Sequence, residues 1–384
     1  RQVSTFQYLS LITSNNGYGG YTFGDSMDLI STGSYAYRLT NPDLTWETQE
    51  QLNFGIDARF LNNRLGFEFD WYNKNTRDWL VTAPVLSSFG ANAVSVNGGN
   101  VKNTGIEVGL HWNDNIGKDF QYGANLTLAH NKNEVTKIAN KDGIIHGSGS
   151  VLWEGAEECF RAEVGKPIGY FYGYKVEGVY QTQEEIEHSP KNTLATVTPG
   201  DLKFRDVNGD GEITTADRTM IGNPTPDVTY GFTLGLGYKN WELAVDMMGQ
   251  GGNQIYRTWD NYNWSQFNFM EQRMDRWHGE GTSNTQPLLN TKHTINNLNS
   301  EYYIEDGSFF RIRNVSLAYN FDKALISKIG MQALKLYVNI QNLKTWKHNT
   351  GYTPELGGSA IAFGVDDGSY PMPAIYTFGF NLTF

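Results

Sequence analysis

The sequence predicts an all-β protein that forms part of an antiparallel transmembrane β-barrel with long extracellular loops. Three observations lead to this prediction: segments in which apolar and polar residues alternate, connections whose lengths alternate, and aromatic residues gathered at one end of the segments. Successive side chains of a strand point to opposite faces. Alternation over about ten residues therefore indicates a wall that meets lipid on one face and water on the other.

The final segment, Ile375–Phe384, shows the alternation most clearly. One face carries large apolar side chains: Tyr376, Phe378, Phe380, Leu382 and Phe384. The opposite face is small or polar: Thr377, Gly379, Asn381 and Thr383. The same pattern recurs at residues 52–60, 65–71, 106–112, 120–128, 230–238, 241–247, 315–321 and 334–340. The sequence therefore predicts roughly nine transmembrane strands.

Short and long connections take turns along the chain. The short ones are residues 61–64, 113–119, 239–240 and 322–333, and the long ones are residues 78–103, 139–228, 251–308 and 344–374. Outer-membrane barrels have short periplasmic turns and longer extracellular loops. If Phe384 lies at the periplasmic side, every short connection is periplasmic and every long one is extracellular.

Aromatic residues gather near the predicted periplasmic ends of the strands. They are Phe60, Trp112, Tyr238, Trp241, Tyr319, Phe321 and Phe384. Aromatic rings favour the boundary between lipid and water, so these residues are predicted to form a membrane girdle. On the same side, Lys323–Gly330 is predicted to form one or two helical turns that end at Gly330.

Composition excludes two classes of protein. No run approaches the ~18 apolar residues of a membrane-spanning helix, which excludes a helical membrane protein. The net charge of −11 provides no basic stripe for phosphates, so we expect no nucleic-acid partner. The single cysteine, Cys159, cannot form an intrachain disulfide. No signal peptide is seen at Arg1, so the chain is expected to be processed or to be a piece of a longer protein.

The segment Asp206–Asp217 has the spacing of an EF-hand-like calcium loop. The positions that supply oxygen ligands hold Asp206, Asn208, Asp210, Glu212 (through its backbone carbonyl) and Asp217. Gly211 stands where such a loop turns sharply. We expect a structural Ca²⁺ ion in this loop, although Asp, Asn and Gly also favour a turn that holds no ion.

No catalytic residues are predicted, and we expect the protein not to be an enzyme. Glu154, Glu157 and Glu158 form an acidic cluster, but a charge cluster in a loop is usually only solvated. No nucleophile–base spacing and no HExxH-like metal site occurs in the sequence.

Several ordered motifs resemble those of SusC/RagA-type TonB-dependent transporters. They are Asn41–Glu47 followed by Phe54–Asp57, Asn100–Glu107, Gly165–Gly169, Gly173–Tyr180, Pro199–Asp201, Asp306–Asn314, Tyr337–Leu343 and Gly351–Glu355. In the last motif the family often has Asp where Thr353 stands. The resemblance covers nearly the whole chain.

The resemblance implies an outer-membrane protein of Bacteroidota that imports large nutrients, either oligosaccharides or peptides. It also implies a barrel of about 22 strands, outer-membrane lipid around it, and a SusD-like surface lipoprotein over its mouth. Energy would come from the TonB–ExbB–ExbD complex, acting through an N-terminal plug and TonB box. Because the predicted strands account for only part of such a barrel, residues 1–384 are expected to be its C-terminal portion, without the plug and the TonB box.

Two groups of residues bear on contact with a substrate: inward-facing polar side chains, most of which are expected to be solvated or to contact the plug, and an aromatic loop. Inward-facing polar side chains are expected to form a hydrated, mildly acidic wall: Asn53, Asp57, Arg59, Glu68, Asp70, Glu107, Gln121, Asn125, Glu242 and Asp246. In an aromatic loop at residues 256–277, Trp259, Tyr262 and Trp264 are candidates for stacking on a sugar ring. Packing against other loops or against the lipoprotein would use the same residue types.

Three other functions or folds compete with this interpretation. A passive outer-membrane porin would show the same strand pattern, and only a plug and a TonB box distinguish the two. A surface-exposed glycan-binding or hydrolytic β protein is a further alternative. A soluble β-sandwich or propeller also has alternating strands, but it does not explain the ordered short and long connections. The sequence does not identify the substrate.

Overall fold

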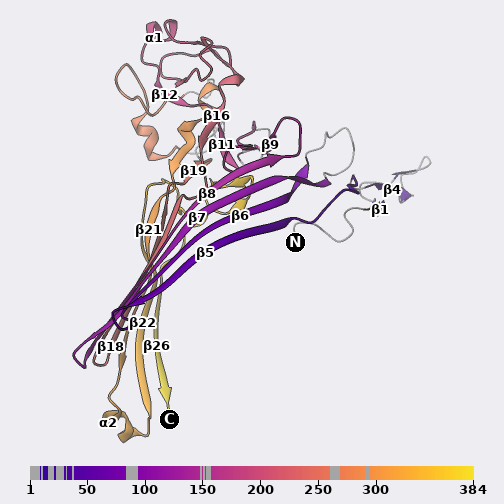
Figure 1. Cartoon of the computed structure of the whole chain (residues 1–384). Coiled ribbons are helices and arrows are strands. Elements are labelled where there is room, and N and C mark those ends of the chain that lie inside the picture. The colour runs from indigo at the N-terminus through magenta and orange to yellow at the C-terminus, as the bar shows by residue number, and fades with distance from the viewer. Residues whose placement is uncertain are drawn as a thin grey trace.

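The main element of the fold is an antiparallel sheet of long strands (Figure 1). The computed structural model describes residues 9, 12–15, 21–22, 30–31, 33–36, 39–83, 94–147, 149, 152, 157–259, 269–289 and 294–384. Within them, nine strands pair in the order β26-β22-β21-β18-β17-β8-β7-β6-β5. Each strand of the sheet pairs with the sheet strands that precede and follow it in sequence, so the sheet is an up-and-down meander.

All nine predicted strands are confirmed. The strands are β5 (Thr48–Phe60), β6 (Leu65–Ala83), β7 (Val94–Ile116), β8 (Phe120–Ile138), β17 (Val228–Tyr238), β18 (Trp241–Gly251), β21 (Phe309–Asn320), β22 (Ala333–Lys347) and β26 (Ile375–Thr383). Each overlaps one of the alternating segments. No helix among the described residues is long and apolar enough to cross a membrane.

Three predicted connections have bounds that are wrong by several residues. Residues 78–103 are mostly strand, because β6 continues to Ala83 and β7 begins at Val94, with residues 84–93 outside the described residues. Likewise, residues 113–116 belong to β7, which leaves 117–119 as the turn. Residues 344–347 belong to β22, so the last long connection begins at residue 348. The apolar alternation fades toward these strand ends, whereas the backbone ladder of β6 and β7 continues past a bulge at Trp79. In β6 and β7 the backbone pairing therefore extends further than the alternation of apolar and polar side chains from which the strand bounds were predicted.

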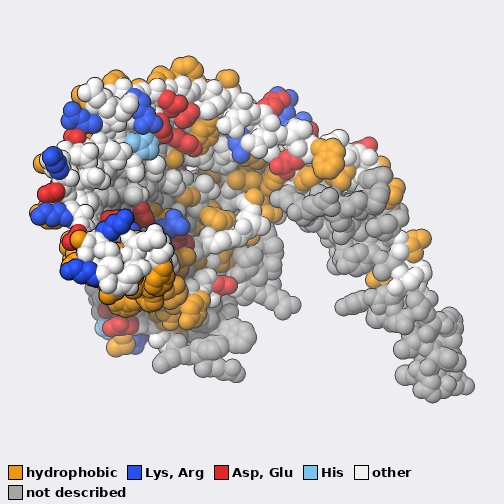
Figure 2. Space-filling model, turned by 90° about the horizontal axis from the view of Figure 1, so that it is seen from below, with side chains coloured by type: hydrophobic (Ala, Val, Ile, Leu, Met, Phe, Trp, Pro, Cys, Tyr) orange, Lys and Arg blue, Asp and Glu red, His pale blue; other side chains and the backbone are white. Residues whose placement is uncertain are grey.

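The register gives the sheet two chemically different faces. Directly opposite residues share a face, and one row across β6, β7, β8 and β17 is Phe69, Val108, Leu128 and Tyr230. The other face carries pairs such as Asp57 and Glu68. On the apolar face, Phe378 is 78% exposed. An apolar surface this continuous needs a non-aqueous neighbour. Seen from below, the sheet curves as an arc that stays open on one side (Figure 2).

The end of the sheet with the long connections carries small folded units (Figure 1). Residues between β8 and β17 form β9 (Ile144–Gly147), β10 (Phe160–Glu163), β11 (Tyr170–Gly173), β12 (Val176–Val179), α1 (Gln183–Glu187), β13 (Lys191–Asn192), β14 (Leu202–Phe204), β15 (Glu212–Ile213), η3 (Thr215–Asp217) and β16 (Thr219–Gly222). The later loops form β19 (Gln254–Arg257), η4 (Glu271–Asp275), η5 (Thr294–Asn297), η6 (Glu301–Tyr303), β20 (Ile304–Asp306), β23 (Gly358–Ser359), β24 (Ala362–Phe363) and β25 (Val365–Asp366).

Aromatic clusters hold these loops together as a folded rim. One cluster joins Phe160 and Phe171 to Tyr256 and Tyr303, although these residues come from two different loops. Phe171 and Tyr256 meet edge to face, with ring centroids 5.8 Å apart. A second cluster includes Leu202, Phe204, Ile213 and Ile295, all nearly or completely buried. The long connections therefore contain their own hydrophobic cores.

The opposite end of the sheet has tight turns. The predicted helical turn at Lys323–Gly330 is confirmed as α2 (Lys323–Ile326) followed by the 3₁₀ turn η7 (Ser327–Ile329). Gly330 ends it in the left-handed conformation, with φ of 79°. Near the N-terminus, β1 (Ile12–Asn15) pairs with β4 (Gly33–Ala36), and β2 (Tyr21–Thr22) pairs with β3 (Ile30–Ser31).

Gly249 allows a close cross-strand contact in the sheet. Tyr230 lies opposite Gly249, and its hydroxyl donates a hydrogen bond to the carbonyl of Phe309, 3.3 Å away, on the far side of β18. A Cβ atom at Gly249 would lie 2.4 Å from the Tyr230 ring and 2.5 Å from the Phe309 carbonyl oxygen. The ring thus occupies space that any side chain at position 249 would fill.

We expect Gly249→Ala to destabilise the sheet by about 1–3 kcal/mol, because the added methyl displaces the Tyr230 ring and meets a backbone oxygen. Urea unfolding of the full-length protein in lipid vesicles would measure the loss. Gly235→Ala is the matched control on β17, since a Cβ there meets only one atom, 3.9 Å away. Equal destabilisation by the two variants would contradict the prediction.

Candidate functional site

The inner face of the sheet is a network of polar side chains. Each inward-facing residue named in the sequence analysis lies on this face, as the register places it. Asn53 donates to Asp70 at 3.1 Å, and His111 bridges Glu68 at 3.2 Å and Asn125 at 2.9 Å. These contacts cross strands, so the polar face is held by side chains as well as by the backbone ladder. That this face lines a water-filled lumen stays a prediction.

The residues predicted as a girdle lie at the turn end of the sheet, where Trp241 and Tyr319 are cross-strand partners with ring centroids 4.8 Å apart. Tyr319 and Phe321 are 5.0 Å apart, edge to face. Phe60 and Trp112 lie at or near the ends of β5 and β7 on the same side. Their role at a lipid boundary stays a prediction.

A second aromatic group on the outer face was missed by the sequence analysis. The Phe310 ring stacks on Tyr230, with centroids 6.4 Å apart, and on Trp346, with centroids 5.5 Å apart. Tyr230 and Tyr238 are separated by about 26 Å along β17, close to the height of the apolar band of an outer-membrane barrel. Phe310 and Trp346 lie outside the alternating segments, and cross-strand pairing alone brings them together.

The predicted calcium loop forms a compact turn. The Asp206 carboxylate accepts from the N–H groups of Gly209 (2.6 Å) and Gly211 (2.8 Å). Asn208 Oδ1 accepts from the N–H of Asp210, and Asp210 Oδ1 accepts from the N–H of Glu212, each at 2.9 Å. Both glycines have positive φ, 76° and 86°, which suits the sharp turn. Asp206, Asn208 and Asp210 keep oxygen lone pairs that these bonds do not use.

Asp217 holds the loop from inside. It is fully buried, and its Oδ1 accepts from the N–H of Val207 at 2.9 Å while its Oδ2 accepts from the N–H of Thr214 at 2.7 Å. Burial raises the pKa of Asp217, but the hydrogen bonds from the backbone of Thr214, Val207 and Asn208 outweigh it and hold the pKa below its usual range. Asp217 therefore stabilises this turn as a carboxylate.

The donor set suits Ca²⁺ in part. Oxygen atoms of Asp206, Asn208 and Asp210 have the chemistry that Ca²⁺ prefers. Among the described residues, however, no group of three or more His, Cys, Asp or Glu side chains is placed to hold a metal ion. Asp217 therefore does not join Asp206 and Asp210 as a third carboxylate at a common point. Calcium in this loop stays a prediction.

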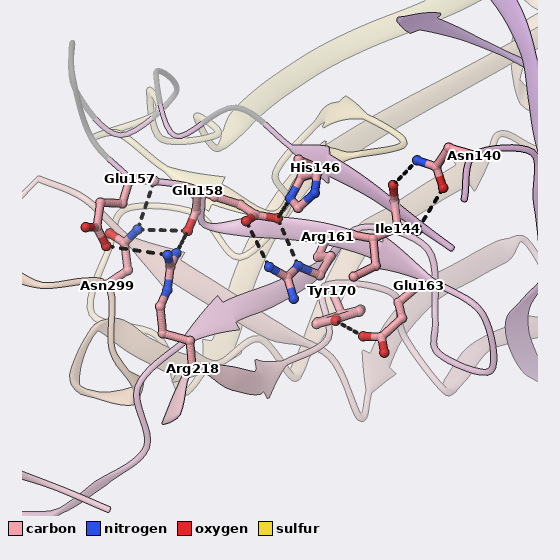
Figure 3. Close-up of polar contacts among 10 residues, drawn as sticks. All are labelled: Asn140, Ile144, His146, Glu157, Glu158, Arg161, Glu163, Tyr170, Arg218 and Asn299. Atoms are coloured by element: carbon pink, nitrogen blue, oxygen red, sulfur yellow. Dashed lines mark hydrogen bonds and ion pairs between the residues drawn. The ribbon is translucent and has the colours of Figure 1, made fainter. Parts of the chain in front are cut away.

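The acidic cluster is an ion-pair network (Figure 3). The Glu158 carboxylate takes two hydrogen bonds of 3.0 Å from Arg161 and one of 2.9 Å from His146. Arg218 lies 3.5 Å from Glu157 and also donates to the Glu158 carbonyl. Burial raises the pKa of Glu158, but the bonds from Arg161 and His146 hold it below its usual value. Glu154 lies outside the described residues. The network joins the segment before β10 to His146 of β9, to Arg161 of β10 and to Arg218 just before β16, and has a structural role.

Only one of the three aromatic candidates for sugar stacking can be placed, because Tyr262 and Trp264 lie outside the described residues. The ring of Trp259 lies 5.6 Å from the Arg257 guanidinium. Arg257 is buried and forms a 2.7 Å ion pair with Glu305. Trp259 thus packs against a structural ion pair, and its contact with a substrate stays a prediction.

A family model described as TonB dependent receptor-like, beta-barrel matches residues 8–343 of this chain. The TonB-dependent receptor P26 of Formosa agariphila is 33% identical over 365 residues, which cover 92% of this chain and 36% of that protein. SusC of Bacteroides thetaiotaomicron is 26% identical over 390 residues, which cover 99% of this chain and 36% of that protein. The chain thus spans about a third of the length of these relatives.

A solved structure of the RagAB peptide transporter has the same fold. It matches 100% of this chain and 39% of that chain with a TM-score of 0.77, at 24% identity. The RagAB peptide importer in its closed-closed state matches with the same TM-score, at 22% identity and 39% coverage of that chain. At these identities the likeness concerns the fold alone.

We expect Asp217→Asn to open the calcium-like loop, because an amide cannot accept hydrogen bonds at both of its terminal atoms. The loss is about 1–3 kcal/mol of local stability. Hydrogen exchange at the N–H groups of Val207 and Thr214 would accelerate correspondingly at neutral pH.

In the wild type, the contribution of the Asp217 carboxylate to the stability of the loop is present above its unfolded pKa and is lost as pH falls below about 4. Glu212→Gln is the control in the same loop, because its exposed carboxylate faces Lys191 at 4.0 Å and bonds neither Val207 nor Thr214; equal acceleration by both variants would contradict the assignment.

Proposed function

The chain belongs to the TonB-dependent receptor β-barrel family, whose members reside in the bacterial outer membrane, and we propose that the whole protein is a SusC-like importer of large nutrients. The nutrient is an oligosaccharide or a peptide. One observation carries the proposal: the nine-stranded meander is apolar outside and polar inside, with tight turns at one end and a folded rim at the other. No catalysis is proposed.

The rim supports a partner on the extracellular side. Its loops are joined by buried aromatic clusters that include Tyr256, Tyr303 and Phe204, so they present a defined surface and not loose coils. A surface lipoprotein of the SusD type would cover the mouth of the barrel by resting on this surface. The aromatic loop at residues 256–277 is the part of the rim we assign to that contact or to the substrate.

Energy coupling is proposed to come from the TonB–ExbB–ExbD complex. A wall of β-strands is rigid and hydrogen-bonded throughout, so it does not by itself move a large solute against a gradient. We place the moving part in an N-terminal plug with a TonB box. A passive porin is the competing function, because it would share the wall and lack the coupling.

Calcium is proposed as a structural ion of the loop at Asp206–Asp217. Asp206, Asn208 and Asp210 would supply side-chain oxygens and Glu212 its backbone carbonyl. Asp217 would order the loop from beneath, through its bonds to Val207 and Thr214. When bound, the ion would stabilise this part of the rim by neutralising the exposed carboxylates.

Uptake by cells tests the transport proposal. Bacteria that make the full-length protein should accumulate fluorescent oligosaccharides or peptides, and deletion of its gene should abolish accumulation of one of the two classes. Deleting TonB or collapsing the proton gradient should reduce uptake to the level of the deletion strain. Uptake that continues without TonB and without the gradient would show a passive porin instead.

Chelation tests the proposed ion. Removing Ca²⁺ from the full-length protein with EGTA should raise amide hydrogen exchange at residues 206–213 by about tenfold or more, equivalent to about 1.4 kcal/mol, and adding Ca²⁺ back should reverse the change. Asp206→Asn should abolish this response, whereas Asp367→Asn, in a different loop, should retain it. If hydrogen exchange in the wild type is the same with and without Ca²⁺, the proposal of a Ca²⁺ ion in this loop is wrong.

A further inference from the structure

A pocket of about 730 Å³ lies on the inner face of the sheet, where β18, β21 and β22 meet. Its lining includes Asp246, Arg311, Arg313, Asn314, Glu355 and Met372. Glu355 and Met372 belong to the loop that follows β22, so the pocket is bounded by the wall and by a rim loop. This volume lies within the range of known small-ligand sites.

A β-bulge shapes the pocket. The register of β21 and β22 runs from Ile312 opposite Lys344 to Asn314 opposite Gln341, so Arg313 faces two residues of the other strand. One of those two, Asn342, has a φ of 53° and donates to the carbonyl of Pro373 at 3.1 Å. Bulges re-aim side chains, and here the consecutive residues Arg313 and Asn314 both line the pocket.

The two arginines of the pocket are in different states. Arg311 is buried, and it forms an ion pair with Glu355 and a 2.8 Å hydrogen bond from Nε to Thr345. Arg313 is exposed, and no carboxylate among the described residues lies within ion-pair distance of it. Arg311 therefore fastens the rim loop to the wall, whereas the guanidinium of Arg313 is available to a ligand.

The charge balance selects the ligand. Arg311 and Glu355 neutralise each other, and Asp246 accepts a 3.4 Å hydrogen bond from Asn314. A phosphate dianion would be repelled by Asp246. A planar carboxylate carries a single charge and matches the two parallel donors of a guanidinium. The amides of Asn339 and Gln341 also line the pocket, and they suit the hydroxyl or amide groups beside that carboxylate.

We propose that this pocket is a subsite for a carboxylate-bearing substrate, with Arg313 binding the carboxylate and with Asn339 and Gln341 binding the polar groups next to it. The inference rests on the proposed importer function and narrows its substrate class. Uronic-acid oligosaccharides and peptides with free carboxylates share this chemistry, so the test includes both.

Calorimetric titration of the purified full-length protein tests the subsite with two matched pairs of probes. One pair is an oligogalacturonate and a neutral galactose oligomer of the same length. The other pair is an acidic peptide and the same peptide with its carboxylates replaced by amides. In at least one pair, the wild type should bind the carboxylated member about tenfold or more tightly.

Two variants assign that preference to Arg313. Arg313→Gln should abolish the preference while leaving the affinity for the neutral member within about twofold, since Arg313 is exposed and forms no ion pair with any described residue. Arg205→Gln, an exposed arginine of the rim that lies 3.1 Å from Glu177, is the control and should retain the preference. Melting temperatures of both variants should match that of the wild type.

The outcomes separate this inference from the importer proposal. Equal affinity within both pairs, tighter binding of the neutral members, no binding of either carboxylated probe, or a preference that survives Arg313→Gln would each overturn the subsite. If the preference holds but cells import nothing in a TonB-dependent way, the subsite stands and the transport proposal fails. If cells import nutrients in a TonB-dependent way and the preference is absent, the transport proposal stands and the subsite fails.

Discussion

The structure depends on the pairing of every backbone N–H and C=O group that lies in lipid, since hydrocarbon offers these groups no other partner. The meander meets this requirement between its nine strands by pairing each with its neighbours in sequence, while β5 and β26 stand at the edges of the described sheet. Pairing then fixes which residues share a face, so it also determines that Phe69 and Tyr230 lie outside while Asp57 and Glu68 lie inside. The two faces, the aromatic groups and the polar network all follow from this ladder.

The strands could be predicted because lipid acts on one face only. Each segment such as 230–238 must place apolar residues at every second position, and that constraint is visible in a single sequence. This constraint disappears above the membrane, where both faces of a strand meet water or protein. The continuation of β6 to Ala83 and the start of β7 at Val94 were therefore missed, although their backbones pair like the rest. The short elements of the rim have no such periodic signal.

The candidate sites divide in the same way. The loop at Asp206–Asp217 could be recognised because its donors follow one another in sequence, and the turn has the expected hydrogen bonds. The position of Asp217 beneath the loop was not predictable, because it follows from burial and not from spacing. The pocket at Arg313 is assembled by cross-strand register and a bulge, so its parts come from separate segments. The grouping of Tyr230 with Phe310 and Trp346 was not predicted for the same reason.

The unequal length of the strands has a mechanical consequence. Strands β6, β7 and β8 have 19, 23 and 19 residues, whereas β17 and β18 have 11 each. At about 3.3 Å per residue, the hydrogen-bonded wall extends further along the strand direction on the β6–β8 side by about 25–40 Å. The tall side is a stiff extension that cannot bend independently of the barrel, whereas the low side is continued only by short sheets and side-chain contacts. The upper edge of this sheet is therefore oblique, and a hinge within the described residues would lie on its low side.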